Sequence, residues 1–402
     1  MKVYQINVVC GSGSTGRIAV DLAHAVKEYG GESRIAYGRG DAPQDVDAVK
    51  ISNKLDLYIH AMFTRITDKH GLYSKGSTRR LIKDIQEYKP DIIHLHNVHG
   101  YYVNYEMLFR FLKKYNKPIV WTLHDCWTFT GHCAYFDFVG CDKWKTGCFA
   151  CPQKSKYPIS ILKDNSKNNF YKKKRAFNSL GNVTIVTVSE WLKRITKESF
   201  LNQFPIIKIS NGINLQVMKP TESDLRNKNQ LENVKVLLGV ATVWDERKGL
   251  DTFLELAKIL PEQYKIVLIG LSKQQKEYLP ENILAIDRIS NPKEMAEWYT
   301  VADIFVNTSV EETMGLTTVE AMACGTPVIV MNTTASPELV NENCGKIVEP
   351  NDLRMLKDAV TMLDKTKKIS DNCICHAKEY EKDKQYKKYI YLYQKILDEA
   401  EN

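Results

Sequence analysis

Short apolar runs alternate with amphipathic stretches along the chain, and this alternation predicts strands and helices in turn. In the amino-terminal half, the apolar runs that predict strands lie at residues 3–10, 33–37, 91–96, 118–124, 183–188 and 206–210. The stretches between them have apolar residues at helical spacing, as at residues 78–88 and 105–115. Strands that alternate with helices indicate a parallel sheet. An α/β fold is therefore expected for this half.

The same alternation begins again at residue 234 and predicts a second sheet. Its strands are expected at residues 234–241, 264–270, 283–287, 302–307 and 328–330, with a helix at 292–300. The stretch 220–233 is dense in Asn, Lys, Glu and Asp, and we interpret it as a linker. Because 402 residues are many for one core, two domains are expected. We place them at residues 1–215 and 216–384, followed by a helix at 385–402.

Composition and charge narrow the class of protein. Apolar residues make up 44% and charged residues 26%, which is typical of a globular protein. Residues 1–10 are too short and polar for a secretory signal, and no run of about 18 apolar residues follows, so a cytoplasmic location is expected. The ten cysteines then indicate reduced thiols or metal ligands. The net charge of +8 suits nucleic acid, phosphate-bearing substrates or an anionic membrane surface.

The stretch 311–330 carries the clearest chemistry. It follows a predicted strand and is expected to form a loop, a helix that begins near Leu316, a turn and a strand. Gly315 allows close approach of a ligand to the backbone, and the free N–H groups of the helix form an anion site. Glu312 and Glu320, eight residues apart, can accept hydrogen bonds from hydroxyls. A nucleotide sugar, with its diphosphate, ribose and sugar ring, fits this combination.

The stretch resembles the Glu-x7-Glu signature of the retaining glycosyltransferases of family 4, including the continuation Glu-Ala-Met-Ala-Cys-Gly-Thr-Pro-Val. The resemblance implies a GT-B fold, in which two doubly wound Rossmann-like domains face a cleft. It also implies that the helix at 385–402 packs back on the first domain. The implied activity is transfer of a sugar from a nucleotide-diphosphate sugar, a UDP- or GDP-sugar, to a hydroxyl with retained configuration. An ordinary strand–helix unit with surface glutamates is the alternative for this stretch.

The resemblance assigns roles to individual residues. His124, in Thr-Leu-His-Asp, matches the histidine placed against the donor sugar, and Lys248 matches the lysine that holds the diphosphate. The arginine that usually follows the glycine of the preceding strand is missing, and Arg247 is the candidate substitute. The implied catalytic residues are His124, Glu312 and Lys248. The implied donor-binding residues are Gly13, Arg247, Lys248, Gly315, Leu316, Thr317 and Glu320. No catalytic metal is required, because cations and a helix N-terminus can stabilise the leaving group.

The glycine-rich loop after the first strand supports an alternative function. Residues 11–16 form a G-x-G-x-x-G turn, which is typical of dinucleotide-binding folds. The acidic residue that would bind a ribose at the end of the next strand is missing, although Arg39 leaves an NADP-dependent oxidoreductase possible. A P-loop would need Lys and Ser or Thr where Arg17 and Ile18 stand. We therefore interpret Gly11–Gly16 as a glycine loop that faces a cleft.

A cysteine-rich insertion is expected at about residues 126–151. Cys133, Cys141, Cys148 and Cys151 offer four thiolates, with Cys126 and His132 as substitutes. Four such ligands would close a tetrahedral shell and hold a structural rather than a catalytic zinc ion. Scattered reduced cysteines are the alternative. The insertion resembles one found in a subgroup of family 4 related to colanic acid and other surface polysaccharide biosynthesis enzymes.

The segment 154–175 is basic, with aromatic and aliphatic residues between the charges. Its sequence ends in the cluster Lys172, Lys173, Lys174 and Arg175. This pattern suits an anionic membrane surface or a lipid diphosphate, so peripheral contact with the inner face of the membrane and a lipid-linked glycan acceptor are expected. A solvated helix face is equally compatible with the pattern. No nucleic-acid-binding motif accompanies it, so a zinc-bearing nucleic-acid binder is the weaker alternative and no nucleic-acid partner is expected.

Overall fold

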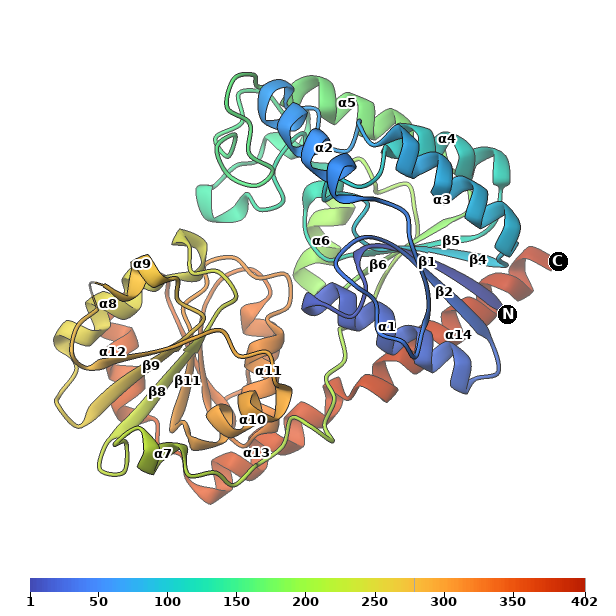
Figure 1. Ribbon diagram of the computed structural model, residues 1–402. Helices are drawn as coiled ribbons and strands as arrows, with labels where there is room; N and C mark the ends of the chain where they lie inside the picture. The colour runs from blue at the N-terminus through green and yellow to red at the C-terminus, as the bar shows by residue number, and fades with distance from the viewer. Residues whose placement is uncertain (278, 402) are drawn as a thin grey trace. The chain divides into compact units, whose positions relative to one another are not determined.

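The computed structural model describes residues 1–277 and 279–401 of the chain. The chain forms two compact units (Figure 1). The first comprises Met1–Ser210 together with the chain from Gln385 onward, and the second comprises Asn211–Lys384. The boundary lies a few residues before the expected position at 215, because the backbone of Ile213 is hydrogen-bonded to Tyr380 and Lys382 of the second unit.

The first unit contains a sheet of seven parallel strands in the order β3-β2-β1-β4-β5-β6-β7. The strands are β1 (Lys2–Val9), β2 (Glu32–Arg39), β3 (Asp47–Lys50), β4 (Ile92–Leu95), β5 (Ile119–Leu123), β6 (Val183–Thr187) and β7 (Ile206–Lys208). All strands that we predict for this half are present. The edge strand β3 is an addition, because its sequence, Asp-Ala-Val-Lys, is too short and polar to predict it.

Helices follow most strands of this sheet. They are α1 (Gly13–Glu28), α2 (Lys54–Thr67), α3 (Lys75–Tyr88), α4 (Tyr105–Tyr115), α5 (Ser166–Phe177), α6 (Glu190–Glu198) and α14 (Lys382–Glu401). Three short 3-10 helices, η1 (Trp127–Phe129), η2 (Asp137–Val139) and η3 (Lys143–Lys145), lie in the cysteine-rich insertion. Helix α4 has the bounds that the apolar spacing predicts. Asn104 caps its first turn by accepting a hydrogen bond from the N–H of Met107.

Alternation along the strands divides the core of the first unit into two layers. Val3, Ile92, Val120 and Val186 face α1 and α14. The neighbouring Trp121 points to the opposite face, where its ring lies 5.1 Å from Phe109 of α4 and 5.0 Å from Phe177 of α5. Because α14 fills this core with Tyr386, Tyr389, Ile390 and Tyr393, the carboxyl-terminal helix packs on the first unit.

The second unit contains six parallel strands in the order β10-β9-β8-β11-β12-β13. They are β8 (Lys235–Val240), β9 (Tyr264–Ile269), β10 (Ile283–Ile286), β11 (Ile304–Asn307), β12 (Val328–Met331) and β13 (Gly345–Val348). The helices are α7 (Leu225–Lys228), α8 (Leu250–Ile259), α9 (Lys273–Lys276), α10 (Pro292–Val301), α11 (Leu316–Ala323), α12 (Leu353–Met362) and α13 (Lys367–Ala377). Three 3-10 helices accompany them, η4 (Glu246–Lys248), η5 (Ser336–Leu339) and η6 (Lys378–Tyr380). Helices α8 and α12 cover one face of the sheet through Phe253, Leu256, Leu356 and Val360.

The stretch 220–233 is not a free linker. Arg226 donates hydrogen bonds to the carbonyl of Val301 and to the carboxylate of Asp303, which directly precedes β11. The high content of Asn, Lys, Glu and Asp suggested solvation, but this arginine ties the stretch to the body of the second unit. The stretch 220–233 therefore belongs to the second unit, which begins at Asn211.

Candidate functional site

The loop between β11 and α11 is organised by the end of its strand. Asn307 accepts a hydrogen bond from the N–H of Ser309 and donates one to the hydroxyl of Thr318 in α11. Gly315 precedes the helix at φ 85°, in the left-handed region that favours glycine. Leu316 and Thr317, in the first turn of α11, are partly exposed. The first turn of α11 therefore reaches the surface of the second unit.

A second loop, formed by η4, is hydrogen-bonded alongside the first. The N–H of Val310 donates to the carbonyl of Arg247, and the guanidinium of Arg247 donates to the carbonyl of Glu311. The hydroxyl of Thr308 donates to the carbonyl of Lys248. These bonds bring two cationic side chains to the loop that leads into α11.

Lys248 and Glu312 form an ion pair across these two loops. The Lys248 side chain is 20% exposed and the Glu312 side chain 13%, so the pair is largely withdrawn from water but still reachable. Burial raises the pKa of a carboxyl group, but Lys248 and Arg247 outweigh that effect and hold the pKa of Glu312 below its usual value. Glu312 is therefore ionised at neutral pH.

Glu320, in the second turn of α11, accepts a hydrogen bond of 2.9 Å from the hydroxyl of Tyr299 in α10. Tyr299 is fully buried, and its hydroxyl fixes one oxygen of the carboxylate. The sequence does not reveal this role of Tyr299, because nothing in the spacing of α10 distinguishes a tyrosine that orients a carboxylate from one that only packs. The structure thus adds a positioning residue to the predicted set.

In the first unit, His124 follows β5 and contacts His96, which follows β4. The Nε2 of His124 lies 3.1 Å from the Nδ1 of His96, and the Nε2 of His96 lies 3.0 Å from the Oε1 of Gln5. Burial lowers the pKa of His124 to about 4 and the pKa of His96 well below its usual value, so both rings are neutral at pH 7. His96 then donates to Gln5 and accepts from His124. This chain of hydrogen bonds fixes the tautomer of His124.

The glycine loop of the first unit closes on itself. The N–H of Gly11 donates to the carbonyl of Gly16, and Gly13, at φ 63°, starts helix α1. Asn7 ties the loop to β1, since its side-chain amide donates to the carbonyls of Val9 and Thr15. Of the predicted residues, His124 and Gly13 belong to the first unit, and the remainder of the catalytic and donor-binding set belongs to the second.

The cysteine-rich insertion brings its thiols together without forming a metal centre. Cys133, Cys141, Cys148 and Cys151 line one small pocket. Within residues 1–277 and 279–401, however, no group of three or more His, Cys, Asp or Glu side chains is placed to hold a metal ion. The Sγ of Cys148 instead accepts the N–H of Gly131, and the thiols of Cys133 and Cys151 are hydrogen-bonded to each other. The prediction of a structural zinc ion is therefore not supported.

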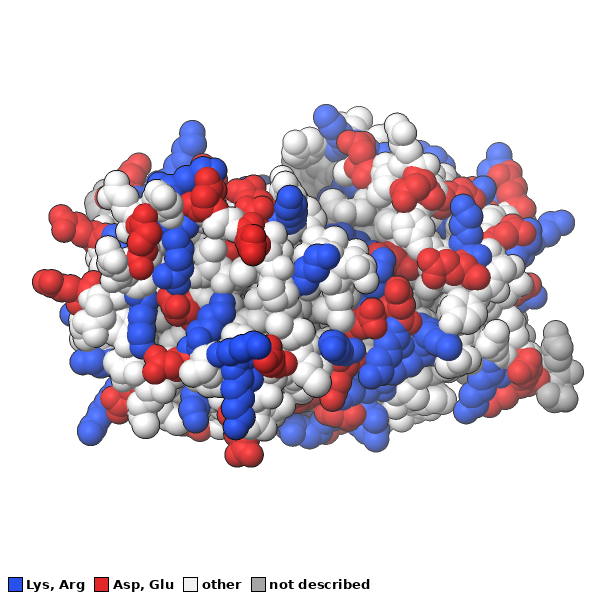
Figure 2. All heavy atoms as spheres, turned by 90° about the horizontal axis from the view of Figure 1, so that it is seen from below, with Lys and Arg blue, Asp and Glu red and all other residues white. Residues whose placement is uncertain are grey.

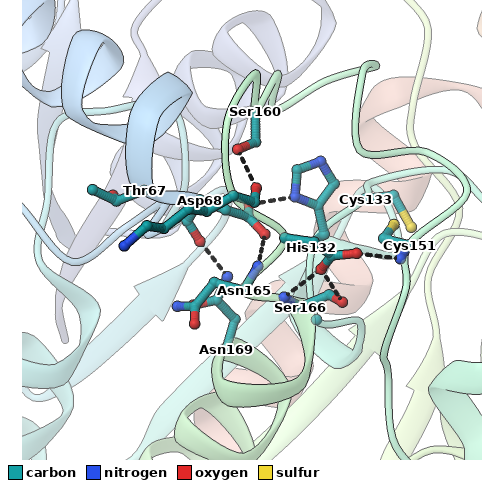
Figure 3. Close-up of polar contacts among 12 residues, drawn as sticks. Thr67, Asp68, His132, Cys133, Cys151, Ser160, Asn165, Ser166 and Asn169 are labelled. Atoms are coloured by element: carbon teal, nitrogen blue, oxygen red, sulfur yellow. Dashed lines mark hydrogen bonds and ion pairs between the residues drawn. The ribbon is translucent and has the colours of Figure 1, made fainter.

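A buried ion pair joins this insertion to the end of α2 (Figure 3). The Nδ1 of His132 contacts the Oδ1 of Asp68, and neither side chain is exposed. Burial lowers the pKa of an imidazole, but Asp68 outweighs that effect and raises the pKa of His132. The other oxygen of Asp68 accepts the N–H of Asn165, which precedes α5. Asp68 thus connects the end of α2 with the insertion and with α5.

The basic segment 154–175 is only partly available for a partner. Lys173 is buried under Trp127, with its ammonium 3.3 Å from the ring centroid, and it donates to the carbonyls of Trp127 and Thr130. Lys172 and Arg175 lie 3.9 Å from Glu106. The expectation that the whole cluster 172–175 faces a membrane is therefore wrong for Lys173, which is part of the core.

Two further observations concern possible partners. On the face drawn in Figure 2, Lys and Arg are interspersed with Asp and Glu, so this face has no extended surface of one charge. Among the described residues, no helix combines the length and the apolar character needed to span a bilayer.

Two family models match the chain, one for each unit. Residues 15–217, just over half of the chain, match the family model "Glycosyltransferase Family 4". Residues 234–365 match the model "Glycosyl transferases group 1". A putative colanic acid biosynthesis glycosyl transferase, WcaC of Escherichia coli, is 31% identical over 171 residues. That alignment covers 39% of this chain and 41% of the relative, so the chain spans less than half the length of this relative.

Solved structures match the whole chain. Sucrose-phosphate synthase of Thermosynechococcus elongatus superposes with a TM-score of 0.72 at 16% identity, over 99% of both chains. Anabaena Alr3699/HepE, in complex with UDP and glucose, superposes with a TM-score of 0.67 at 16% identity, over 97% of this chain and 98% of that one. At this identity the likeness concerns the fold, and it confirms the predicted GT-B architecture of two parallel-sheet α/β domains.

Proposed function

The chain belongs to glycosyltransferase family 4, and from this premise we propose that it transfers a sugar from a nucleotide-diphosphate sugar to a hydroxyl of a glycan acceptor, with retained configuration. The observation that carries the proposal is the hydrogen-bonded junction of η4 with the loop before α11. This junction holds Arg247 and Lys248 against the loop that leads into α11, whose first turn is partly exposed. Two cations and free N–H groups in one place suit a leaving diphosphate.

The cationic side chains and the first N–H groups of α11 are assigned to the diphosphate in this mechanism. Lys248, Arg247 and the N–H groups at Gly315, Leu316 and Thr317 would bind the diphosphate and stabilise the charge that grows on it as the bond to the sugar breaks. Lys248 is held in place by Glu312 before the donor binds. The mechanism assigns no step to a metal ion.

The two carboxylates would bind hydroxyls of the donor. Glu320, whose orientation is set by Tyr299, would accept from the ribose. Glu312 and the neutral His124 would position the sugar ring, with Gly13 allowing close approach of backbone to the donor. Fixed donors and acceptors contribute to catalysis because they are oriented before the reaction begins.

The donor is proposed as a class of nucleotide sugar. The Anabaena structure with the same fold is a complex with UDP and glucose, and the Escherichia coli relative bears a name from polysaccharide biosynthesis. We infer that this chain uses a UDP- or GDP-sugar and acts on a lipid-linked glycan at the cytoplasmic face of the membrane. The comparisons favour neither an NADP-dependent oxidoreductase nor a zinc-bearing nucleic-acid binder.

A donor panel tests the proposal. The protein is mixed with UDP- and GDP-sugars, UDP, GDP and NADPH, and both thermal stabilisation and hydrolysis of the nucleotide sugar are measured. We expect one nucleotide series to raise the unfolding temperature and to be hydrolysed slowly without an acceptor. Stabilisation by NADPH alone, with no response to any nucleotide sugar, would contradict the proposal and favour the oxidoreductase.

A further inference from the structure

Helix α2 carries its large apolar side chains on its outer face. Tyr58 is 74% exposed, Leu55 66%, Met62 50%, Ile59 41%, and Phe63 and Ile66 40% each. Positions 55, 58, 59, 62, 63 and 66 follow the spacing of one helical face, so these side chains form a single stripe. Helix α4 shows the usual arrangement, since its apolar residues Tyr105, Leu108, Phe109 and Leu112 are buried. In α2, by contrast, the large apolar side chains point outward.

A buried polar network prevents α2 from turning its stripe inward. His60, on the opposite face of the helix, accepts the N–H of Gly71 at its Nε2, and its Nδ1 lies 2.7 Å from the hydroxyl of Ser74. Ser74 in turn donates to the carbonyl of Tyr101. Burial lowers the pKa of His60 to about 3, so the ring is neutral and its Nδ1 donates to Ser74. Rotation of the helix would break these bonds and expose the network.

The loop before α5 extends the apolar surface. Ile161 and Leu162 are 65% and 68% exposed, and Ile159 is also exposed. The N–H of Ile161 donates to the carbonyl of Arg65 at 2.7 Å, so this loop is joined directly to α2. Figure 1 shows α2 on the outer side of the first unit, next to this loop. Ten of the twenty exposed large hydrophobic side chains among the described residues lie in α2 and in residues 157–162.

The exposed charges around the stripe are mostly positive. Lys54, Arg65, Lys69, Lys156 and Lys163 are exposed at or near its borders. Within residues 53–69 and 154–167, Asp164 is the single exposed acidic residue that the structure describes, and it accepts hydrogen bonds from Ser166 and from the N–H of Cys151. Asp56 is engaged by Ser77 and Arg80. An apolar stripe with cations beside it matches an interface of acyl chains and anionic headgroups.

We propose that the outer face of α2, together with residues 159–162, docks the protein on a bilayer that contains anionic lipids. The stripe enters the boundary between headgroups and acyl chains, and Arg65 and Lys163 contact headgroup phosphates. The choice of a bilayer rather than another protein rests partly on the lipid-linked acceptor of the proposed function. The surface itself is independent of that function, since none of its residues belongs to the predicted donor site.

Vesicle co-sedimentation of the full chain tests the docking surface. Vesicles of phosphatidylcholine alone are compared with vesicles that also contain phosphatidylglycerol. The variant Tyr58→Ser/Met62→Ser removes two side chains of the stripe. The matched control, Met355→Ser/Met362→Ser, removes two exposed apolar side chains of α12 in the second unit, where Met355 is 40% and Met362 79% exposed. Both pairs lie on helix surfaces, so neither change creates a cavity in a core.

We expect the wild type and the α12 control to pellet with the anionic vesicles, and the α2 variant to partition at least about tenfold more weakly. Arg65→Gln/Lys163→Gln should weaken binding to the anionic vesicles and reduce its dependence on salt. Equal binding by the α2 variant and the wild type overturns the proposal, as does a wild type that stays in solution with both kinds of vesicle. Dilution-dependent dimers of the wild type, lost in the α2 variant and seen without vesicle binding, would assign the stripe to a second copy instead.

Hydrolysis of the nucleotide sugar, measured without vesicles, separates this proposal from the proposed function. We expect the α2 variant and its control to keep the wild-type rate. If no nucleotide sugar is hydrolysed or bound by the wild type, while vesicle binding still depends on Tyr58 and Met62, the glycosyltransferase proposal fails and the docking surface stands. Normal hydrolysis without vesicle binding supports the glycosyltransferase proposal and overturns the docking surface.

Discussion

The ammonium group of Lys248 is hydrogen-bonded to the carboxylate of Glu312, although the two residues are 64 positions apart in the chain. Contacts with neighbouring residues in the chain do not explain the position of either side chain. The backbone bonds between η4 and the loop before α11 bring them together, and the pair holds a cation at the loop that leads into α11.

The first prediction concerns Lys248. Lys248→Ala should lower kcat by about 10²–10³-fold with a smaller change in donor affinity, because a charge aimed at the leaving diphosphate acts mainly in the transition state. Steady-state transfer rates measure both quantities. Lys346→Ala, at an exposed lysine of β13, is the control and should keep wild-type rates. Normal turnover of Lys248→Ala would remove this residue from the mechanism.

The second prediction concerns Glu320 and Tyr299. Glu320→Ala removes the proposed ribose acceptor and should weaken nucleotide binding by roughly 10–100-fold, the range expected for hydrogen bonds to a charged group. Tyr299→Phe removes only the hydroxyl that orients Glu320, so a loss below about tenfold is expected. Calorimetric titration with the nucleoside diphosphate gives both values. Unchanged affinity in Glu320→Ala, with an intact fold by circular dichroism, would exclude the proposed contact.

The third prediction concerns the backbone between the two loops. Gly249 has φ 70°, and a Cβ atom there would lie 2.5 Å from the carbonyl oxygen of Thr308. Gly249→Ala should therefore lower the free energy of unfolding by more than about 1 kcal/mol and weaken donor binding, since it separates Lys248 from Glu312. Urea denaturation measures the stability. Gly76→Ala, where a Cβ meets nothing within 4 Å in helix α3, should instead stabilise by about 0.5–1 kcal/mol.

The fourth prediction concerns pH. Burial lowers the pKa of His60 and His94 to about 3 and that of His124 to about 4, whereas an unfolded histidine titrates near pH 6.5. The unfolded chain therefore binds more protons below pH 6.5. The stability that these neutral rings contribute is complete above pH 6.5 and is lost as the pH falls toward 4 and 3. Each histidine should cost roughly 1.4 kcal/mol per pH unit in that window.

Urea denaturation of the full chain between pH 7.5 and 4.5 checks this slope. His60→Gln keeps an acceptor for the N–H of Gly71 but cannot take up a proton, so the loss of stability per pH unit should become smaller by about one histidine. A slope that does not change in His60→Gln would show that His60 is not held neutral by burial.

The periodicity of the sequence determined most of the architecture. Apolar runs at strand spacing predicted the central strands of both sheets, and the apolar spacing of residues 105–115 placed α4 to the residue. These elements could be predicted because their signal is local, in the spacing of residues a few positions apart. The Glu-x7-Glu run likewise predicted the glycine at the turn and the start of α11, where Gly315 and Leu316 lie as expected.

Tertiary structure decided the features that depend on distant residues. Tyr299 orients Glu320, Arg226 converts an expected linker into a packed segment, and Lys173 lies under Trp127 rather than facing a membrane. In α2 the spacing shows an amphipathic helix, yet only the bonds of His60 to Gly71 and Ser74 decide that its apolar face points outward. Hydrogen bonds of buried polar groups join residues far apart in the chain, so the spacing of neighbouring residues cannot predict them.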